Sequence, residues 1–116
     1  MAFANVKLLE RHFLEHGTDF GSGSPGEYEK AAILFLKSPR PSGVEECRRS
    51  GGNLVRFEGA SNTFGVLGST GVVKTFFKPI RCSDVPVHLR AMRKMSGRCH
   101  EKADNLTYFK ETCARP

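Results

Sequence analysis

The sequence predicts a small α+β fold in which N-terminal helices pack on an antiparallel β-sheet. Apolar residues have helical spacing up to about residue 37, and after the breaker cluster SPRPSG (38–43) they form β-rich runs separated by short turns. Short turns between successive strands make the neighbouring strands antiparallel. At 116 residues the chain has room for one core, so we expect a single domain over residues 1–116.

The segment HFLEHGTDFG (12–21) begins within the first expected helix and continues past its end. This helix is expected to end near His16 and Gly17, because glycine suits a left-handed helix cap. Its apolar side chains should form one stripe that faces the core. This stripe comprises Val6, Leu9, Phe13 and Leu14.

The second expected helix follows a loop rich in glycine and serine. Ser24 is the expected N-cap, Pro25 the first helical residue, and Glu27 the acid of a capping box. The apolar face of this helix should pack against the sheet. That face comprises Tyr28, Ala31, Ala32, Phe35 and Leu36.

Four β-rich runs follow, and none of them alternates cleanly between apolar and polar residues. Arg56 shares a strand face with Leu54, and Thr75 shares one with Val73 and Phe77. Arg56 and Thr75 are therefore expected on faces that are not wholly core. The runs are VEECRR (44–49), NLVRFE (53–58), NTFGVLG (62–68) and VVKTFFKP (72–79). Two short helices are expected in the remainder, from HLRAMRKMSG and HEKADNLTYFKETC.

The cysteines are Cys47, Cys82, Cys99 and Cys113, and their wide spacing matches no known disulfide framework. A zinc site from Cys82, Cys99, His100 and Cys113 is an alternative, but it lacks the short C-x-x-C pairs that mark such sites. We therefore expect reduced thiols, or one disulfide in the tail, and no metal or cofactor.

Charge is distributed unevenly along the chain. The net charge is +6, but residues 1–36 carry −2 and the remainder carries +8. A basic sheet and tail favour a polyanionic partner, although a solvated surface that keeps the protein soluble gives the same pattern. No apolar run is long enough to span a bilayer, and the N-terminus lacks the features of a signal peptide, so no membrane association is expected.

The chain resembles a known group of bacterial toxin domains. The pattern HF-x-x-HG-x-x-FG, followed by N-x-FG-V and T-x-F-x-P, is similar to that of the C-terminal nuclease domains of polymorphic toxins, including those of contact-dependent inhibition systems. The resemblance covers residues 5–80 and implies the fold group shared by barnase, EndoU, colicin D and RelE. Residues 81–116, a basic tail with three cysteines, lie outside it, and three roles stay open for this tail. It could brace the sheet, belong to the interface with an immunity protein, or bind RNA through Arg90, Arg93, Lys94 and Arg98.

The resemblance implies metal-independent cleavage of RNA, often of tRNA, through attack of the ribose 2′-OH on the adjacent phosphorus. This reaction needs a base, an acid and a cation, and histidine suits the first two because its ordinary pKa is about 6.5. His12 and His16 are four residues apart and share a helix face, and the helix dipole should favour the charged form of His16. Asp19 is a candidate to orient an imidazole. The alternatives are a structural role for His12, a capping role for His16 and a turn role for Asp19.

The candidate phosphate ligands lie in the sheet. Arg56 is the candidate for a bidentate clamp, and its alternative is an ion pair with Glu45 or Glu46. Thr75 is a candidate hydrogen-bond donor to a phosphate oxygen, and its alternative is strand propensity alone. Four further cations are expected to follow the RNA backbone: Lys74, Lys78, Arg48 and Arg49.

The sequence therefore predicts an exported ribonuclease toxin that acts in the cytoplasm of a target bacterium. Its expected partners are RNA, an acidic immunity protein and, as an open possibility, a host activator protein. One alternative is a nonenzymatic RNA- or ribosome-binding module, which would not depend on the histidines. A zinc deaminase is disfavoured because its H-x-E and P-C-x-x-C motifs are missing from the sequence.

Overall fold

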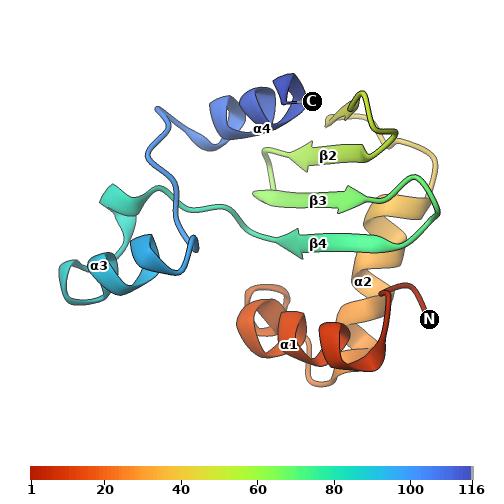
Figure 1. The fold of residues 1–116 in the computed structure, drawn as a ribbon, viewed down its shortest axis with the longest axis horizontal. Coiled ribbons are helices and arrows are strands. Elements are labelled where there is room, and N and C mark those ends of the chain that lie inside the picture. The colour runs from red at the N-terminus through yellow and green to blue at the C-terminus, as the bar shows by residue number, and fades with distance from the viewer. Residues whose placement is uncertain (116) are drawn as a thin grey trace.

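The computed structural model describes residues 1–115 and shows a four-stranded antiparallel sheet between layers of helices (Figure 1). The predicted α+β class, with two helices before the sheet, is confirmed. Among the described residues, no helix is long and apolar enough to cross a membrane. The helices are α1 (Val6–His16), α2 (Pro25–Lys37), α3 (Val87–Met95) and α4 (Asn105–Ala114), with 3₁₀ turns η1 (Gly17–Phe20) and η2 (Cys82–Asp84). The strands are β1 (Val44–Arg48), β2 (Leu54–Glu58), β3 (Thr63–Leu67) and β4 (Val73–Phe77), adjacent in that order.

Each face of the sheet contributes to its own apolar core. On one face, Val73 and Phe76 of β4 pack with buried residues of α2 and α1. On the other face, Phe64 and Val66 of β3 pack with Phe109 of α4. The basic tail is therefore an integral layer of the domain, because α4 covers a face of the sheet that the N-terminal helices leave open.

A β-bulge changes the predicted facing of strand β4. Val66 pairs with Thr75 and Leu67 with Val73, which leaves Lys74 as an extra residue. Val73 therefore points to the α2 side together with Phe76, and the prediction that it shares a face with Thr75 is wrong. Thr75 lies on the opposite face with its partner Val66.

Helix α2 begins as predicted. The Ser24 hydroxyl accepts a hydrogen bond from the N–H of Glu27, and Pro25 occupies the first turn. The Glu27 carboxylate accepts from the N–H of Gly23, one residue before the N-cap, where the predicted capping box would use the N–H of Ser24. The predicted face packs inward, since Tyr28, Ala32 and Leu36 are buried and Ala31 and Phe35 pack against them.

The buried face of α1 differs from the prediction. Val6 and Leu14 are 53% and 80% exposed, respectively, whereas Leu9 is buried. Residues 12, 13 and 16 continue the face of Leu9 at helical spacing and are half-buried. The two histidines therefore lie on the inward side of the helix, where apolar residues would be expected.

Gly17 does not form a left-handed cap. Its φ is −59°, and the chain continues into η1 until Gly21, whose φ is +64°. Gly17 is buried because the ring of Phe13 lies over it, so that a Cβ there would approach the ring to 2.6 Å. The residue is small because of this contact, and the left-handed position predicted for it belongs to Gly21.

All four cysteines form disulfides, Cys47–Cys113 and Cys82–Cys99. The expectation of reduced thiols is wrong, and that of one bridge within the tail is correct for Cys82–Cys99. Cys47–Cys113 was not anticipated, and it ties the end of α4 to strand β1. The zinc alternative is excluded in this form of the protein, because its cysteine sulfurs are bonded to each other.

We expect Gly17→Ala to lower the free energy of unfolding by about 1–3 kcal/mol, because the new methyl group overpacks the contact with Phe13. Denaturant unfolding would measure the change. Gly51→Ala is the matched control, because a Cβ there meets nothing within 4 Å. Equal stability of the two variants would contradict the packing role of Gly17.

Candidate functional site

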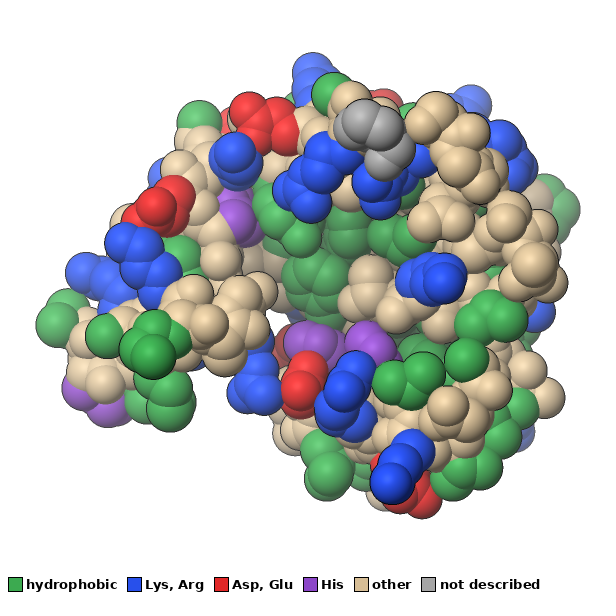
Figure 2. All heavy atoms as spheres, in the orientation of Figure 1, with side chains coloured by type: hydrophobic (Ala, Val, Ile, Leu, Met, Phe, Trp, Pro, Cys, Tyr) green, Lys and Arg blue, Asp and Glu red, His purple; other side chains and the backbone are tan. Residues whose placement is uncertain are grey.

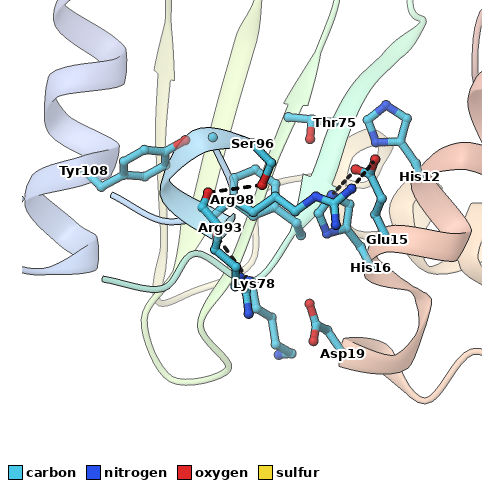
Figure 3. A pocket seen from close by; sticks show the side chains of 12 residues that line it. His12, Glu15, His16, Asp19, Thr75, Lys78, Arg93, Ser96, Arg98 and Tyr108 are labelled. Atoms are coloured by element: carbon cyan, nitrogen blue, oxygen red, sulfur yellow. Dashed lines mark hydrogen bonds and ion pairs between the residues drawn. The ribbon is translucent and has the colours of Figure 1, made fainter. Parts of the chain in front are cut away.

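A cavity of about 380 Å³ lies between the C-terminal end of α1, strand β4 and two segments of the tail. Figure 2 shows the hollow, with apolar side chains at its floor, two histidines at one side and several Lys and Arg side chains around it. Figure 3 shows the labelled residues converging on it from four parts of the chain. The predicted residues that line it are His12, His16, Asp19, Thr75 and Lys78.

The two imidazoles form one side of the cavity. The ring centroids of His12 and His16 are 6.0 Å apart, and His16 lies 5.4 Å from the ring of Phe77 on β4. Burial lowers the pKa of both histidines below the usual 6.5. The expectation that the helix end favours a charged His16 is wrong, because desolvation outweighs the opposing effects. Both imidazoles are therefore mainly neutral at pH 7.

Glu15 occupies the position next to the imidazole that we expected for Asp19. Its Oε2 lies 3.5 Å from Nε2 of His16, and its Oε1 lies 3.1 Å from Nη2 of Arg98. Burial lowers the pKa of His16, and the carboxylates of Glu15 and, to a smaller extent, Asp19 oppose this change. The carboxylate that holds His16 is thus its neighbour in the sequence.

His12 has a free ring nitrogen in the same region. Its Nδ1 is buried and has no hydrogen-bond partner within residues 1–115. The other side of its ring faces Phe3, at a centroid distance of 5.4 Å. Because buried polar atoms are normally hydrogen-bonded, this unpaired nitrogen is unusual, and it belongs to a side chain that lines the cavity.

Strand β4 supplies polar groups beside the histidines. Thr75 and Lys78 both line the cavity. The Lys78 ammonium lies 5.1 Å from the centroid of the Phe20 ring and donates a hydrogen bond to the carbonyl of Ser61. Lys74 is not brought to the site: it is exposed at the bulge and does not line the cavity.

Arg56 is not part of the cavity, contrary to the expectation that it clamps phosphate. The side chain is buried, and its Nε donates to Glu46 at 2.7 Å. Its Nη1 donates to the carbonyls of Phe35 and Ser38, at 2.9 Å and 2.7 Å, at the end of α2. Arg56 therefore anchors α2 to the sheet, and its ion pair with Glu46 is the alternative considered from the sequence.

Arg48 and Arg49 also lie away from the cavity. Arg48 donates to the carbonyl of Gly52 at 3.1 Å, within the β1–β2 turn. Arg49 donates to the carbonyl of Arg115 at 3.3 Å, which places it beside the end of α4. Neither residue lines the site, so their predicted role along the RNA backbone has no support in this arrangement.

The tail completes the cavity with residues outside the candidate catalytic set, of which Arg93 and Arg98 are among the tail cations left open as RNA contacts from the sequence. Arg93, Ser96 and Arg98 line it from α3 and the segment that follows, and Tyr108 points toward it from α4 (Figure 3). Burial raises the pKa of Tyr108, whose ring stacks on His100 at 4.6 Å. The basic run RKMSGR was the available signal, but nothing in the sequence indicated that it folds back onto α1.

Comparisons with known proteins give no family assignment. No protein-family model matches the chain, and no curated protein sequence matches it. Within residues 1–115, no three His, Cys, Asp or Glu side chains are grouped so that they could hold a metal ion. The resemblance to toxin nucleases therefore stays a prediction.

We expect Glu46→Ala to lower the free energy of unfolding by about 1.5–3 kcal/mol, because it removes a charge-assisted hydrogen bond from the buried Arg56. Glu45→Ala is the matched control on the same strand, since Glu45 is exposed. Urea unfolding of both variants measures the difference. A Glu46→Ala variant as stable as the control would contradict the anchoring role of Arg56.

Proposed function

We propose that this domain is an endoribonuclease that cleaves RNA without a metal ion. The observation that carries the proposal is the pair His12 and His16, which face one cavity beside Thr75, Lys78 and the tail arginines. Two imidazoles at this separation are suited to act at the two ends of one phosphodiester. Both histidines occupy inward positions of α1 that apolar side chains usually fill, which supports a role beyond packing.

In the proposed reaction, one imidazole takes the proton of the ribose 2′-OH as the 2′-oxygen attacks phosphorus. The new O2′–P bond forms while the P–O5′ bond breaks. The other imidazole donates its proton to the departing 5′-oxygen. The products are a 2′,3′-cyclic phosphate and a 5′-OH, and the pair of histidines ends with its protons exchanged.

Charge on the phosphate oxygens increases during this reaction, and preorganised donors lower its energy. Thr75 can donate a hydroxyl hydrogen bond, and Lys78, which also lines the cavity, adds a positive charge to its lining. Glu15 holds His16 in place and stabilises its protonated form when it carries the transferred proton.

The resemblance to toxin nuclease domains extends the proposal to the biological role of the protein. The domain would act as an exported toxin on RNA, with tRNA as the expected class, in the cytoplasm of a target bacterium. An acidic immunity protein would protect the producing cell, because opposite potentials speed association with a basic surface. Two disulfides are typical of chains that pass through an oxidising compartment, which supports export.

The competing function is a nonenzymatic RNA-binding module. It shares the basic surface of the chain, whose net charge is +6. The two functions differ in their dependence on the histidines, because binding to phosphates through cations needs no proton transfer. The same cleavage experiment therefore separates them.

We expect purified protein to cleave total bacterial RNA in excess EDTA and to leave 2′,3′-cyclic phosphate ends. His12→Ala and His16→Ala should each lower the cleavage rate by about 10²–10⁴-fold, because each removes one proton-transfer group. Mapping of the fragment ends identifies the product.

His88→Ala is the matched control, since His88 is an exposed histidine of α3 outside the cavity, and it should cleave at the wild-type rate. Intact RNA in the presence of protein that binds it would favour the binding module. Cleavage that persists in both histidine variants would contradict the proposed mechanism.

The pH dependence of cleavage provides a second test. The reaction needs one neutral and one protonated histidine, so kcat/KM peaks midway between their two pKa values. Burial lowers the pKa of both below 6.5, so we expect the maximum below pH 6.5. The rate should then fall toward pH 8, as the acid loses its proton. A profile of kcat/KM against pH measures this, and a maximum in the alkaline range would exclude the histidine pair as acid and base.

A further inference from the structure

The tail contributes a projecting arm, residues 81–100, that forms one wall of the cavity. In Figure 1, α3 stands away from the sheet, and none of its side chains is buried. The arm is closed at its base by the Cys82–Cys99 disulfide. Two backbone hydrogen bonds adjoin the disulfide, from Cys82 N to His100 O at 2.7 Å and from His100 N to Ile80 O at 3.0 Å. The arm is thus a fixed feature attached through a narrow base.

Two arginines of the arm point to the cavity. Arg98 reaches across to α1, where its guanidinium donates to Glu15 at 3.1 Å (Figure 3). Arg93 donates through Nη2 to the carbonyl of Arg98 at 3.1 Å, while its Nε is buried with no hydrogen-bond partner among residues 1–115. Arg98 thus neutralises a carboxylate next to a histidine, and Arg93 lines the cavity with a guanidinium whose Nε has no partner among the described residues.

The arm determines whether the net charge of the residues that line the cavity is negative or positive. Without it, the charged lining residues are the carboxylates of Glu15 and Asp19 and the ammonium of Lys78, a net charge of −1. Arg93 and Arg98 bring the net charge to +1. A cavity that is negative on balance repels phosphate, whereas a positive one attracts it. The body of the domain therefore supplies the histidines but not the charge that a polyanion needs.

We propose that Arg93 and Arg98 bind the phosphate groups of RNA and that the arm is one half of the binding site. The inference rests on the proposed function for the identity of the ligand. Guanidinium groups suit this role because their planar donors match phosphate oxygens. The arm thereby takes the role that the sequence had suggested for Arg56.

The test measures binding separately from cleavage. A single-stranded RNA oligonucleotide with 2′-O-methyl groups at every position lacks the attacking hydroxyl, so its affinity is measured without turnover. Arg93→Gln/Arg98→Gln should weaken this binding by at least about tenfold. The slope of log affinity against log salt should also fall by roughly 1.4, because two phosphate contacts are lost on a single strand.

Lys94→Gln is the control for loss of one positive charge from the arm at a position outside the cavity. Lys94 lies on the same helix but pairs with Glu101 and lines a different pocket. It should bind the oligonucleotide within about twofold of wild type, with a small change in salt slope. A loss as large as that of the double variant would mean that the arm acts only through its overall charge, which would overturn the assignment.

Glu15→Gln tests the proposal in the opposite direction. Removing this carboxylate releases Arg98 and raises the net charge of the cavity, so the oligonucleotide should bind severalfold more tightly. A variant that merely damaged the fold would not gain affinity. Unchanged or weaker binding by Glu15→Gln would contradict a phosphate role for Arg98.

The combined results separate this inference from the proposed ribonuclease. If the double arginine variant binds like wild type, the arm inference is overturned, whatever the histidine variants do. If the wild type binds but never cleaves, while the arm variants lose affinity, the ribonuclease fails and the arm inference stands. If wild type does not bind the oligonucleotide, the arm inference fails, and the cleavage of total RNA alone decides the ribonuclease.

Discussion

The packing of Tyr28 fixes the geometry on which the candidate site depends. Its side chain has no exposed surface, and its hydroxyl donates to the carbonyl of Phe76 on β4. Its ring also contacts Phe3, Phe13 and Phe20, which come from the N-terminal segment, α1 and η1. One side chain of α2 thus joins the element that carries the histidines to the strand that carries the opposing side of the cavity. A substitution at Tyr28 would therefore change the distance between α1 and β4 more than it would change either element itself.

The features that could be predicted from the sequence are those set by neighbouring residues. The capping of α2 by Ser24 and the punctuation of the four strands by short turns depend on local chemistry, and the structure follows both. The inward face of α1 depends on what it packs against, and for that reason the exposed Leu14 was misassigned. The β-bulge at Lys74 likewise changes the side of the sheet on which Val73 lies. This bulge arises from the way β4 pairs with β3. Patterns among neighbouring residues do not determine which distant element a helix or strand face packs against.

The same limit explains why the sequence ranked the histidines correctly as neighbours but could not choose among the candidate cations. The spacing of His12 and His16 places them on one helix face in any helix, so their proximity follows from the sequence. A lone arginine in a strand, by contrast, is compatible with either phosphate binding or a buried ion pair. Arg56 takes the buried role because the carbonyls at the end of α2 accept its hydrogen bonds. The tail arginines meet α1 across a separation of more than 80 residues, as the contact of Arg98 with Glu15 shows.

The attachment of the arm bears on where such a site would work. A disulfide such as Cys82–Cys99 persists in oxidising compartments, whereas the cytoplasm of a bacterium keeps thiols reduced. The base of the arm does not depend on the disulfide alone, because backbone hydrogen bonds also join Cys82 to His100 and His100 to Ile80. Tyr108 also stacks on His100 and ties this base to α4. Reduction would therefore remove one of several attachments of the wall that carries the arginines, and the proposed phosphate contacts of Arg93 and Arg98 would be weaker in a reducing cytoplasm. The packing of Tyr28 would still join α1 to β4.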